Sequence, residues 1–188
     1  MSSPLTEAFA ERMQSVGGRI SYTTAEGLAE TLGGLVERDR PVLFTPELRD
    51  LARQLRDAGH EAYVGTREGV AEQTEAAFEG VLERAGTGVS GSLLGISSTG
   101  SIAVGPGGGN GGLLIAFPPH SVIILQADSL RKNLAEALPE VERRFDELDG
   151  EAVFVSGPSR TADIEMMSVV GVHGPIGLDV IIVDGKEA

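Results

Sequence analysis

Hydrophobic residues recur at helical spacing in several segments of the chain. Leu5, Phe9 and Met13 follow one another at intervals of four, which predicts an amphipathic helix over residues 5–15 that ends at Gly17 and Gly18. The same spacing predicts further helices over residues 25–38, 46–59, 69–85 and 128–138, the last followed by a charged helix that continues to about residue 148. Thr23 or Thr24 is the predicted cap of the helix at 25–38, and Asp128 or Ser129 is the predicted cap of the helix at 128–138.

Short apolar runs between these helices predict buried strands. The clearest is SVIILQ at residues 121–126, and similar runs occupy residues 41–45, 61–64, 101–104, 113–117, 152–155 and 178–183. The segment 87–101 is rich in serine and glycine, and its leucines and isoleucine indicate that it lies against the sheet.

The order of these elements predicts the fold class. A strand, a helix and another strand over residues 41–64 are typical of a parallel unit whose helix covers the sheet, whereas strands in the middle third are too closely spaced for helical crossovers. We therefore expect a three-layer α/β/α fold with a mostly parallel, mixed sheet. Residues 1–18 are predicted to form an N-terminal helical arm, and residues 19–188 a single α/β domain.

Composition and charge narrow the function classes. The 188 residues carry a formal net charge of -13, which disfavours nucleic acid and anionic membranes as partners. Cysteine is absent, so the chain forms no disulfide and holds no cysteine-ligated iron–sulfur or zinc site. No histidines have metal-ligand spacing, and neither a metal nor a cofactor is predicted. Because no apolar run approaches a membrane helix or a secretory signal, we expect a cytoplasmic protein.

Polar groups gather most densely in residues 156–175. Ser159, Thr161 and free backbone N–H groups are hydrogen-bond donors, and Arg160 carries a guanidinium fork suited to carboxylate or phosphate. This pattern predicts an anion-binding loop that also includes Ser156 and Gly157. The alternative is a tight turn whose hydroxyl groups satisfy its own backbone.

Two carboxylates and a histidine follow this loop. Glu165 is a candidate general base or nucleophile, with Asp163 beside it, although such carboxylates more often hold a backbone N–H group or an arginine. His173 lies between glycines and is a candidate proton carrier or hydrogen-bond donor, or else a turn residue. His60 and His120 are expected to be structural.

A glycine-rich loop at residues 105–112 is a second candidate binding element. Its backbone can adopt positive φ and expose N–H groups, so Gly105, Gly107 and Asn110 are candidate ligand contacts. The loop leads into a predicted strand and lacks lysine, and it therefore matches neither a dinucleotide-binding fingerprint nor a phosphate-binding NTPase loop.

Several motifs together resemble the LUD domain family over about residues 41–184. They are GISSTGS at residues 95–101, the glycine loop followed by FPPH at residues 117–120, SGPSRTADIE at residues 156–165, and GVHGP at residues 171–175. The resemblance implies a fold similar to the phosphosugar isomerase and CoA-transferase superfamily. It also implies a three-protein system that oxidises L-lactate to pyruvate, in which the other two proteins carry iron–sulfur clusters.

The resemblance leads to one main hypothesis and two alternatives. The main hypothesis is an accessory, cluster-free subunit that partners iron–sulfur subunits and binds a small carboxylate, phosphate or other anion through Thr99, Gly100, Ser101 and the two loops. The alternatives are a stand-alone CoA-transferase-like or sugar-phosphate isomerase-like enzyme that uses Glu165, and a purely structural subunit. The chain departs from the family at commonly charged positions, which are Ser98, Gly111, Gly112 and Ile176.

Overall fold

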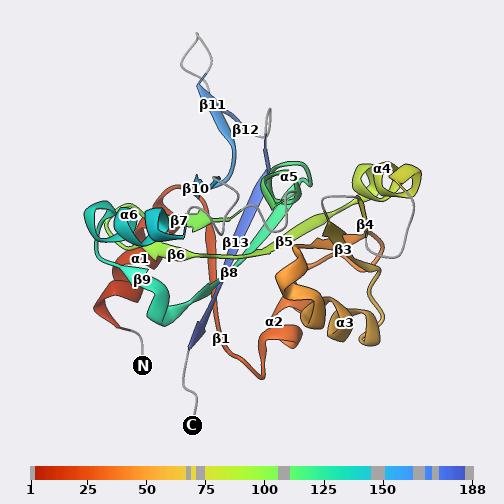
Figure 1. Ribbon diagram of the computed structural model, residues 1–188, viewed down its shortest axis with the longest axis horizontal. Helices are drawn as coiled ribbons and strands as arrows, with labels where there is room; N and C mark the ends of the chain where they lie inside the picture. Colours follow the sequence, from red (N-terminus) through yellow and green to blue (C-terminus); the bar gives the residue numbers. More distant parts are fainter. Residues whose placement is uncertain are drawn as a thin grey trace.

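A computed structural model describes residues 3–66, 69–70, 75–105, 111–144, 151–162, 168–170 and 174–184. In this part of the chain a seven-stranded sheet forms the centre of the molecule, with a smaller four-stranded sheet beside it. A two-stranded ribbon, β11 (Arg160–Ala162) with β12 (Ser168–Val170), projects from the body (Figure 1).

The large sheet is parallel except at one edge. Its strand order is β1 (Arg19–Thr24), β13 (Gly177–Asp184), β8 (His120–Gln126), β5 (Thr87–Gly91), β2 (Val42–Phe44), β3 (Ala62–Thr66) and β4 (Gly69–Val70), and only β4 runs antiparallel to its neighbour. The two central strands β8 and β13 are nearly continuous apolar runs, because both of their faces are covered.

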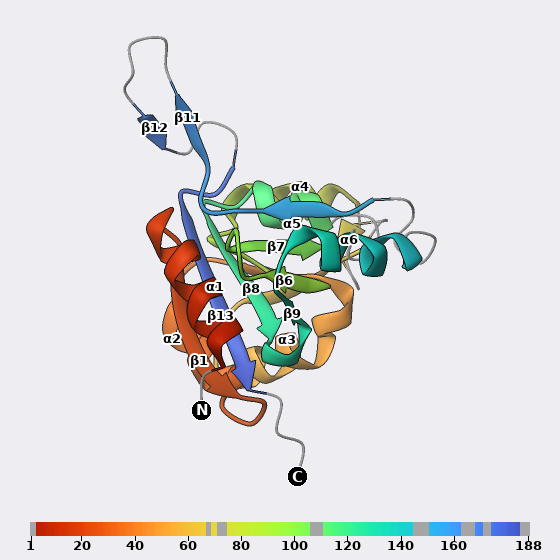
Figure 2. The same ribbon diagram turned by 90° about the vertical axis from the view of Figure 1, so that its left-hand side faces the viewer.

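Two layers cover the faces of this sheet. Helices α2 (Leu28–Leu35) and α3 (Arg49–Asp57), the latter preceded by a 3-10 turn (Pro46–Leu48), pack on one face through Leu32 and Leu55. Helices α1 (Pro4–Ser15), α4 (Glu75–Arg84) and α5 (Gly111–Ala116) lie on the other face together with the smaller sheet (Figure 2). The predicted α/β fold with a mostly parallel, mixed sheet is therefore confirmed.

The smaller sheet has the order β10 (Val153–Val155), β7 (Ser101–Val104), β6 (Leu94–Ile96) and β9 (Leu130–Arg131), and helix α6 (Leu134–Arg143) covers it. Asn133 caps α6, because its side chain accepts a hydrogen bond from the Glu136 N–H group. The predicted cap at Asp128 or Ser129 is wrong, since those residues form a 3-10 turn (Ala127–Ser129).

Helix α5 occupies the segment 113–117 that was predicted as a strand. It approaches the sheet at Gly88, where a Cβ atom would lie 1.7 Å from the carbonyl oxygen of Leu114. A five-residue apolar run does not by itself distinguish a strand from a short buried helix. The predicted strand is therefore wrong, and its apolar residues are buried by a helix instead.

Four other elements differ from the predictions. Strand β1 occupies residues where no strand was predicted, and helix α2 begins after Gly27 without a side-chain cap from either threonine. The segment predicted as a helix from residue 69 begins with strand β4. Strand β5 lies within the segment expected only to rest against the sheet.

Helix α1 contributes to the core of the molecule. Phe9 and Met13 are fully buried and pack with residues of β8 and β13. The division at residue 18 into an arm and a domain stays a prediction. None of the helices within the described residues is long and apolar enough to cross a membrane.

Candidate functional site

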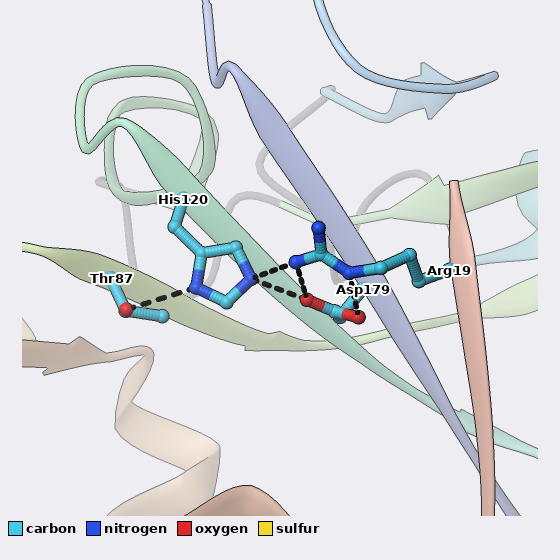
Figure 3. A network of polar contacts seen from close by, with 4 residues as sticks. All are labelled: Arg19, Thr87, His120 and Asp179. Carbon is cyan, nitrogen blue, oxygen red and sulfur yellow. Dashed lines mark hydrogen bonds and ion pairs between the residues drawn. The ribbon is translucent and has the colours of Figure 1, made fainter. Parts of the chain in front are cut away.

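A polar network lies at the amino-terminal ends of four neighbouring strands of the large sheet. Arg19 begins β1, His120 begins β8, Thr87 begins β5, and Asp179 lies near the start of β13 (Figure 3). Strand register brings them together, because Arg19 pairs with Asp179 and Thr87 pairs with His120.

Asp179 is the centre of this network. Its Oδ1 accepts a hydrogen bond from Arg19 Nε at 2.9 Å, and its Oδ2 contacts Arg19 Nη2 at 2.5 Å and His120 Nε2 at 2.6 Å. The other imidazole nitrogen of His120, Nδ1, lies 3.1 Å from the hydroxyl oxygen of Thr87. One carboxylate thus receives a guanidinium fork and an imidazole, an arrangement that favours its charged form.

Burial is uneven across the network. The side chain of Asp179 is 1% exposed, whereas that of Arg19 is 65% exposed. Burial alone would raise the pKa of Asp179, but the hydrogen bonds from His120 and Arg19 and their charges outweigh it and hold that pKa below its ordinary value. The hydrogen bond with Asp179 in turn raises the pKa of Arg19.

The hydrogen-bond partners define the protonation of His120. An ionised carboxylate only accepts hydrogen bonds, so Nε2 must carry the proton that points at Asp179. In the neutral imidazole, Nδ1 then accepts a hydrogen bond from the Thr87 hydroxyl. In the protonated imidazole, Nδ1 donates to the same oxygen. Thr87 can therefore serve both protonation states.

A cavity of about 260 Å³ lies next to the loop after β10. Its described lining comes from the end of α5, strand β10, the following loop and the segment before β13. The lining residues are Ile115, Ala116, Val153, Phe154, Val155, Ser156, Gly157, Ser159, Gly174 and Pro175. Three residues of the predicted anion-binding loop, Ser156, Gly157 and Ser159, therefore face one cavity.

Backbone hydrogen bonds connect the cavity to the network. Ser159 N–H donates to the carbonyl of Pro175 at 2.9 Å, and the N–H groups of Ile176 and Gly177 donate to the carbonyl of Pro119, the residue before His120. Gly177 lies between the two structures, and a Cβ atom there would be 3.3 Å from the His120 ring and 3.7 Å from Arg19 Nη2.

Comparison with a model of the LUD domain gives a match over residues 6–183. The chain belongs to the LUD domain family. The match covers most of the large sheet, the loop after β10 and the segment before β13 that line the cavity, and all four residues of the network. The predicted family resemblance is confirmed.

Curated relatives of this LUD domain are named Lactate utilization protein C. The chain is 25% identical to the protein from Macrococcus caseolyticus over 187 residues, which are 97% of the chain and 79% of the relative. It is 27% identical to Lactate utilization protein C 1 of Bacillus mycoides over 94% of the chain and 77% of the relative. The 33% identical match in Shouchella clausii spans 55% of the chain and 46% of the relative.

The fold has a counterpart among solved structures. A DUF162 family protein from Deinococcus radiodurans superposes with a TM-score of 0.71 over 95% of this chain and 96% of that chain, at 19% sequence identity. This likeness supports the α/β fold assigned to the LUD domain.

Two of the predicted binding segments of the LUD domain lie next to each other, and one of them packs against α1. The hydroxyl groups of Ser101 and Ser156 form a hydrogen bond of 2.7 Å, which joins the turn at Thr99 and Gly100 to the loop after β10. Gly100 has a φ of +68° and lies against the backbone of Met13, so a side chain there would strike α1. The two predicted segments are therefore neighbours.

Arg160 lies beside the chain that leaves α1. A Cβ atom on Gly17 would come within 2.5 Å of an Arg160 guanidinium nitrogen. Arg160 does not line the cavity, although the preceding residue Ser159 does. It is thus placed next to the loop that leads into Arg19.

Several predicted site residues have no structural account. Gly107, Asn110, Asp163, Glu165 and His173 lie outside the described residues. Gly105 directly follows β7, and Thr161 belongs to β11. At the positions that depart from the family, Ser98 is exposed in the turn after β6 and Ile176 is 59% exposed, while Gly111 and Gly112 begin α5.

Sequence reasoning missed the network. It treated His120 as structural and did not single out Arg19, Thr87 or Asp179. One signal was present, because Asp179 interrupts the apolar run of β13, and a carboxylate in a buried strand requires partners. The partners themselves come from three other strands and leave no local pattern in the sequence.

Proposed function

We propose that this LUD domain acts in lactate utilization as an accessory, cluster-free subunit that binds a small carboxylate. The cavity carries the proposal, because Ser156 and Ser159 both line it and backbone hydrogen bonds link it to Pro119, the residue before His120. Its volume of about 260 Å³ leaves room for a three-carbon acid such as lactate or pyruvate together with water. The names of the relatives from Macrococcus caseolyticus and Bacillus mycoides support lactate utilization as the setting.

The chemistry of the lining suits a carboxylate with one further polar group. Hydroxyl groups of serine can donate to carboxylate oxygens or accept from a ligand hydroxyl. Ile115, Val153 and Val155 offer apolar contacts for a methyl group. The net charge of -13 repels anions at long range, and Arg19 and Arg160, which lie outside the cavity lining, are the cations that we propose offset this repulsion.

The absence of cysteine supports the accessory role. A sequence without cysteine supplies no thiolate ligand for an iron–sulfur cluster. Electrons removed from lactate would therefore pass to cluster-bearing partner subunits, while this chain positions or releases the acid. The acidic surface favours a partner with a basic docking face.

Calorimetric titration with L-lactate, pyruvate and inorganic phosphate tests ligand binding. The double variant S156A/S159A should bind at least about tenfold more weakly, which corresponds to about 1.4 kcal/mol. The variant S129A is the matched control, because Ser129 donates only to the carbonyl of Gln126 in an exposed turn. Absence of saturable heat with all three ligands at millimolar concentration would refute small-anion binding.

Reconstitution with candidate cysteine-rich iron–sulfur partner proteins tests the accessory role. Lactate-dependent reduction of a dye should require all components and should fall when this chain is omitted. Full activity without this chain would contradict the role proposed here, even if the chain binds lactate.

A further inference from the structure

The network contains more than the sheet needs for holding its strands together. A single ion pair between β1 and β13 would join those strands, yet the carboxylate also binds an imidazole whose second nitrogen meets a fully buried hydroxyl. Thr87 is 1% exposed and Asp179 is 1% exposed, whereas Arg19 extends outward with 65% of its side chain exposed. The hydrogen bonds run from buried Thr87 through His120 and Asp179 to the exposed guanidinium of Arg19, which is accessible to an anionic ligand.

We infer that Arg19, Asp179, His120 and Thr87 form a proton-coupled carboxylate site, in which Arg19 receives the ligand and His120 takes up one proton from solvent. The inference rests on the proposed function, because it assigns the cation and the proton acceptor that small-carboxylate binding requires. It adds residues that lie outside the predicted loops.

Arg19 is held ready for a second carboxylate. Its Nε and Nη2 atoms are bound by Asp179, which fixes the plane of the guanidinium. Figure 3 shows the third nitrogen, Nη1, directed away from Asp179, and it has no hydrogen-bond partner among the described residues. A guanidinium fixed in this way loses little side-chain entropy when it binds an anion.

The surroundings leave space and positive charge next to Arg19. Gly177 places no side chain between the His120 ring and Arg19. The Arg160 guanidinium lies beside Gly17, two residues before Arg19, where an added Cβ atom would come within 2.5 Å of it, and it forms no ion pair with the described residues. Two guanidinium groups therefore flank the chain that leaves α1, beside the loop whose serines line the cavity.

Charge balance explains why binding should involve a proton. Among the three hydrogen-bonded groups alone, with neutral His120, the charges of Arg19 and Asp179 cancel, and a carboxylate bound to Arg19 adds one negative charge that Arg160, beside Gly17, offsets only from outside the network. Protonation of Nδ1 restores neutrality. The hydroxyl of Thr87 then changes from donor to acceptor by rotating its hydrogen, while the proton on Nε2 stays on the hydrogen bond to Asp179.

Few other charges compete for His120. Among the described residues, the ionised groups that contact it are Asp179 on β13 and Arg19 on β1, while Thr87 is its partner on β5. Because Arg19 Nη2 lies 3.5 Å from Nε2, a carboxylate on Arg19 weakens the repulsion that opposes the imidazolium. Linkage then requires carboxylate affinity to increase as the pH falls.

Calorimetry of L-lactate binding in two buffers with different ionisation enthalpies, at one pH and ionic strength, measures the proton directly. We expect wild-type protein to take up as much as one proton for each lactate bound. The variant H120Q keeps a donor toward Asp179 but cannot titrate, so its proton uptake should fall to zero. The variant R19Q should bind lactate at least about tenfold more weakly.

Matched variants separate binding from folding. R53Q removes an arginine of similar exposure, 63% against 65%, that lies on α3 and pairs with exposed Asp50, and it should leave lactate affinity unchanged. R19K keeps the positive charge and replaces R19Q in the test if R19Q does not fold. Because lysine lacks the guanidinium fork, R19K should still bind lactate more weakly than wild type. Nitrogen NMR of the His120 ring should show Nδ1 gaining a proton when lactate is added.

The outcomes distinguish the inference from the proposed function. If wild-type protein binds lactate without proton uptake and R19Q, R19K and R53Q all bind equally well, the network only fixes the strands, and the inference is overturned while small-carboxylate binding stands. If wild-type protein binds no lactate, pyruvate or phosphate, both fail together.

Discussion

Asp179 stabilises the fold only while its carboxyl group is ionised. It is 1% exposed and receives Arg19 and His120, so removing its charge leaves two cationic or donor groups without their acceptor. Loss of one partner of a buried ion pair costs about 3–5 kcal/mol, and exposure of Arg19 reduces this to about 2–3 kcal/mol. We expect D179N to lose this amount of unfolding free energy at pH 7, as measured by urea denaturation.

The pH dependence of that loss has a defined sign. Because the folded pKa of Asp179 is below its ordinary value, the stabilisation is present above the unfolded pKa of about 3.9 and disappears as the pH falls through the folded pKa. The difference between wild type and D179N should therefore shrink below about pH 4. D50N, at a carboxylate that is 85% exposed, is the control and should stay within about 0.5 kcal/mol of wild type at each pH.

Two glycines should respond to alanine with opposite signs. A Cβ on Gly88 would lie 1.7 Å from the Leu114 carbonyl oxygen, so G88A must push α5 away from the sheet and should cost about 3 kcal/mol or prevent folding. Gly34 lies inside α2 with nothing within 4 Å of an added Cβ, and G34A should gain about 1 kcal/mol from helix propensity. Thermal unfolding of both variants checks the pair, and a stable G88A would contradict the close approach of α5.

At the scale of elements, α1 is the segment whose role is most open to test. A detachable arm would contribute little to unfolding, whereas a helix with Phe9 and Met13 fully buried belongs to the cooperative unit. We expect F9A to lose about 3–5 kcal/mol of unfolding free energy. The exposed Glu11 on the same helix provides the control, and E11A should change stability by less than about 0.5 kcal/mol. Equal stabilities would support the arm predicted from the sequence.

Elements with a strong local signal were predictable, and those defined by tertiary contacts were not. The runs in β8 and β13, and the succession of β2, α3 and β3, follow from apolar patterning and from glycine and proline at helix ends. Strand β1 was not predicted, because an edge strand with partly exposed residues lacks a continuous apolar run. Strand β5 was not predicted either. Its small residues are required by the close approach of α5 to Gly88, a tertiary contact that leaves no local pattern in the sequence.

The candidate site divides in the same way. The serines of the loop after β10 were predicted because hydroxyls, glycine and arginine lie close together in the sequence, and the structure brings Ser156 and Ser159 to one cavity. The network could not be predicted by local reasoning, since Arg19 and Asp179 are 160 residues apart. Only the pairing of parallel strands brings their side chains into contact.

The whole molecule carries a formal charge of -13, and this excess should oppose folding at low ionic strength. Exposed like charges repel across distances that salt shortens, from about 30 Å of screening length at 0.01 M to about 8 Å at 0.15 M. The Arg19–Asp179 pair is less sensitive because Asp179 is buried. We therefore expect salt to stabilise wild-type protein by about 1 kcal/mol over this range, which is a rise of about 2–4 °C in melting temperature. Differential scanning calorimetry in sodium chloride measures the rise, and sucrose at matched osmolality controls for solute exclusion. A melting temperature that falls with added salt would mean that attractive ion pairs, and not the acidic excess, dominate the electrostatics of this LUD domain.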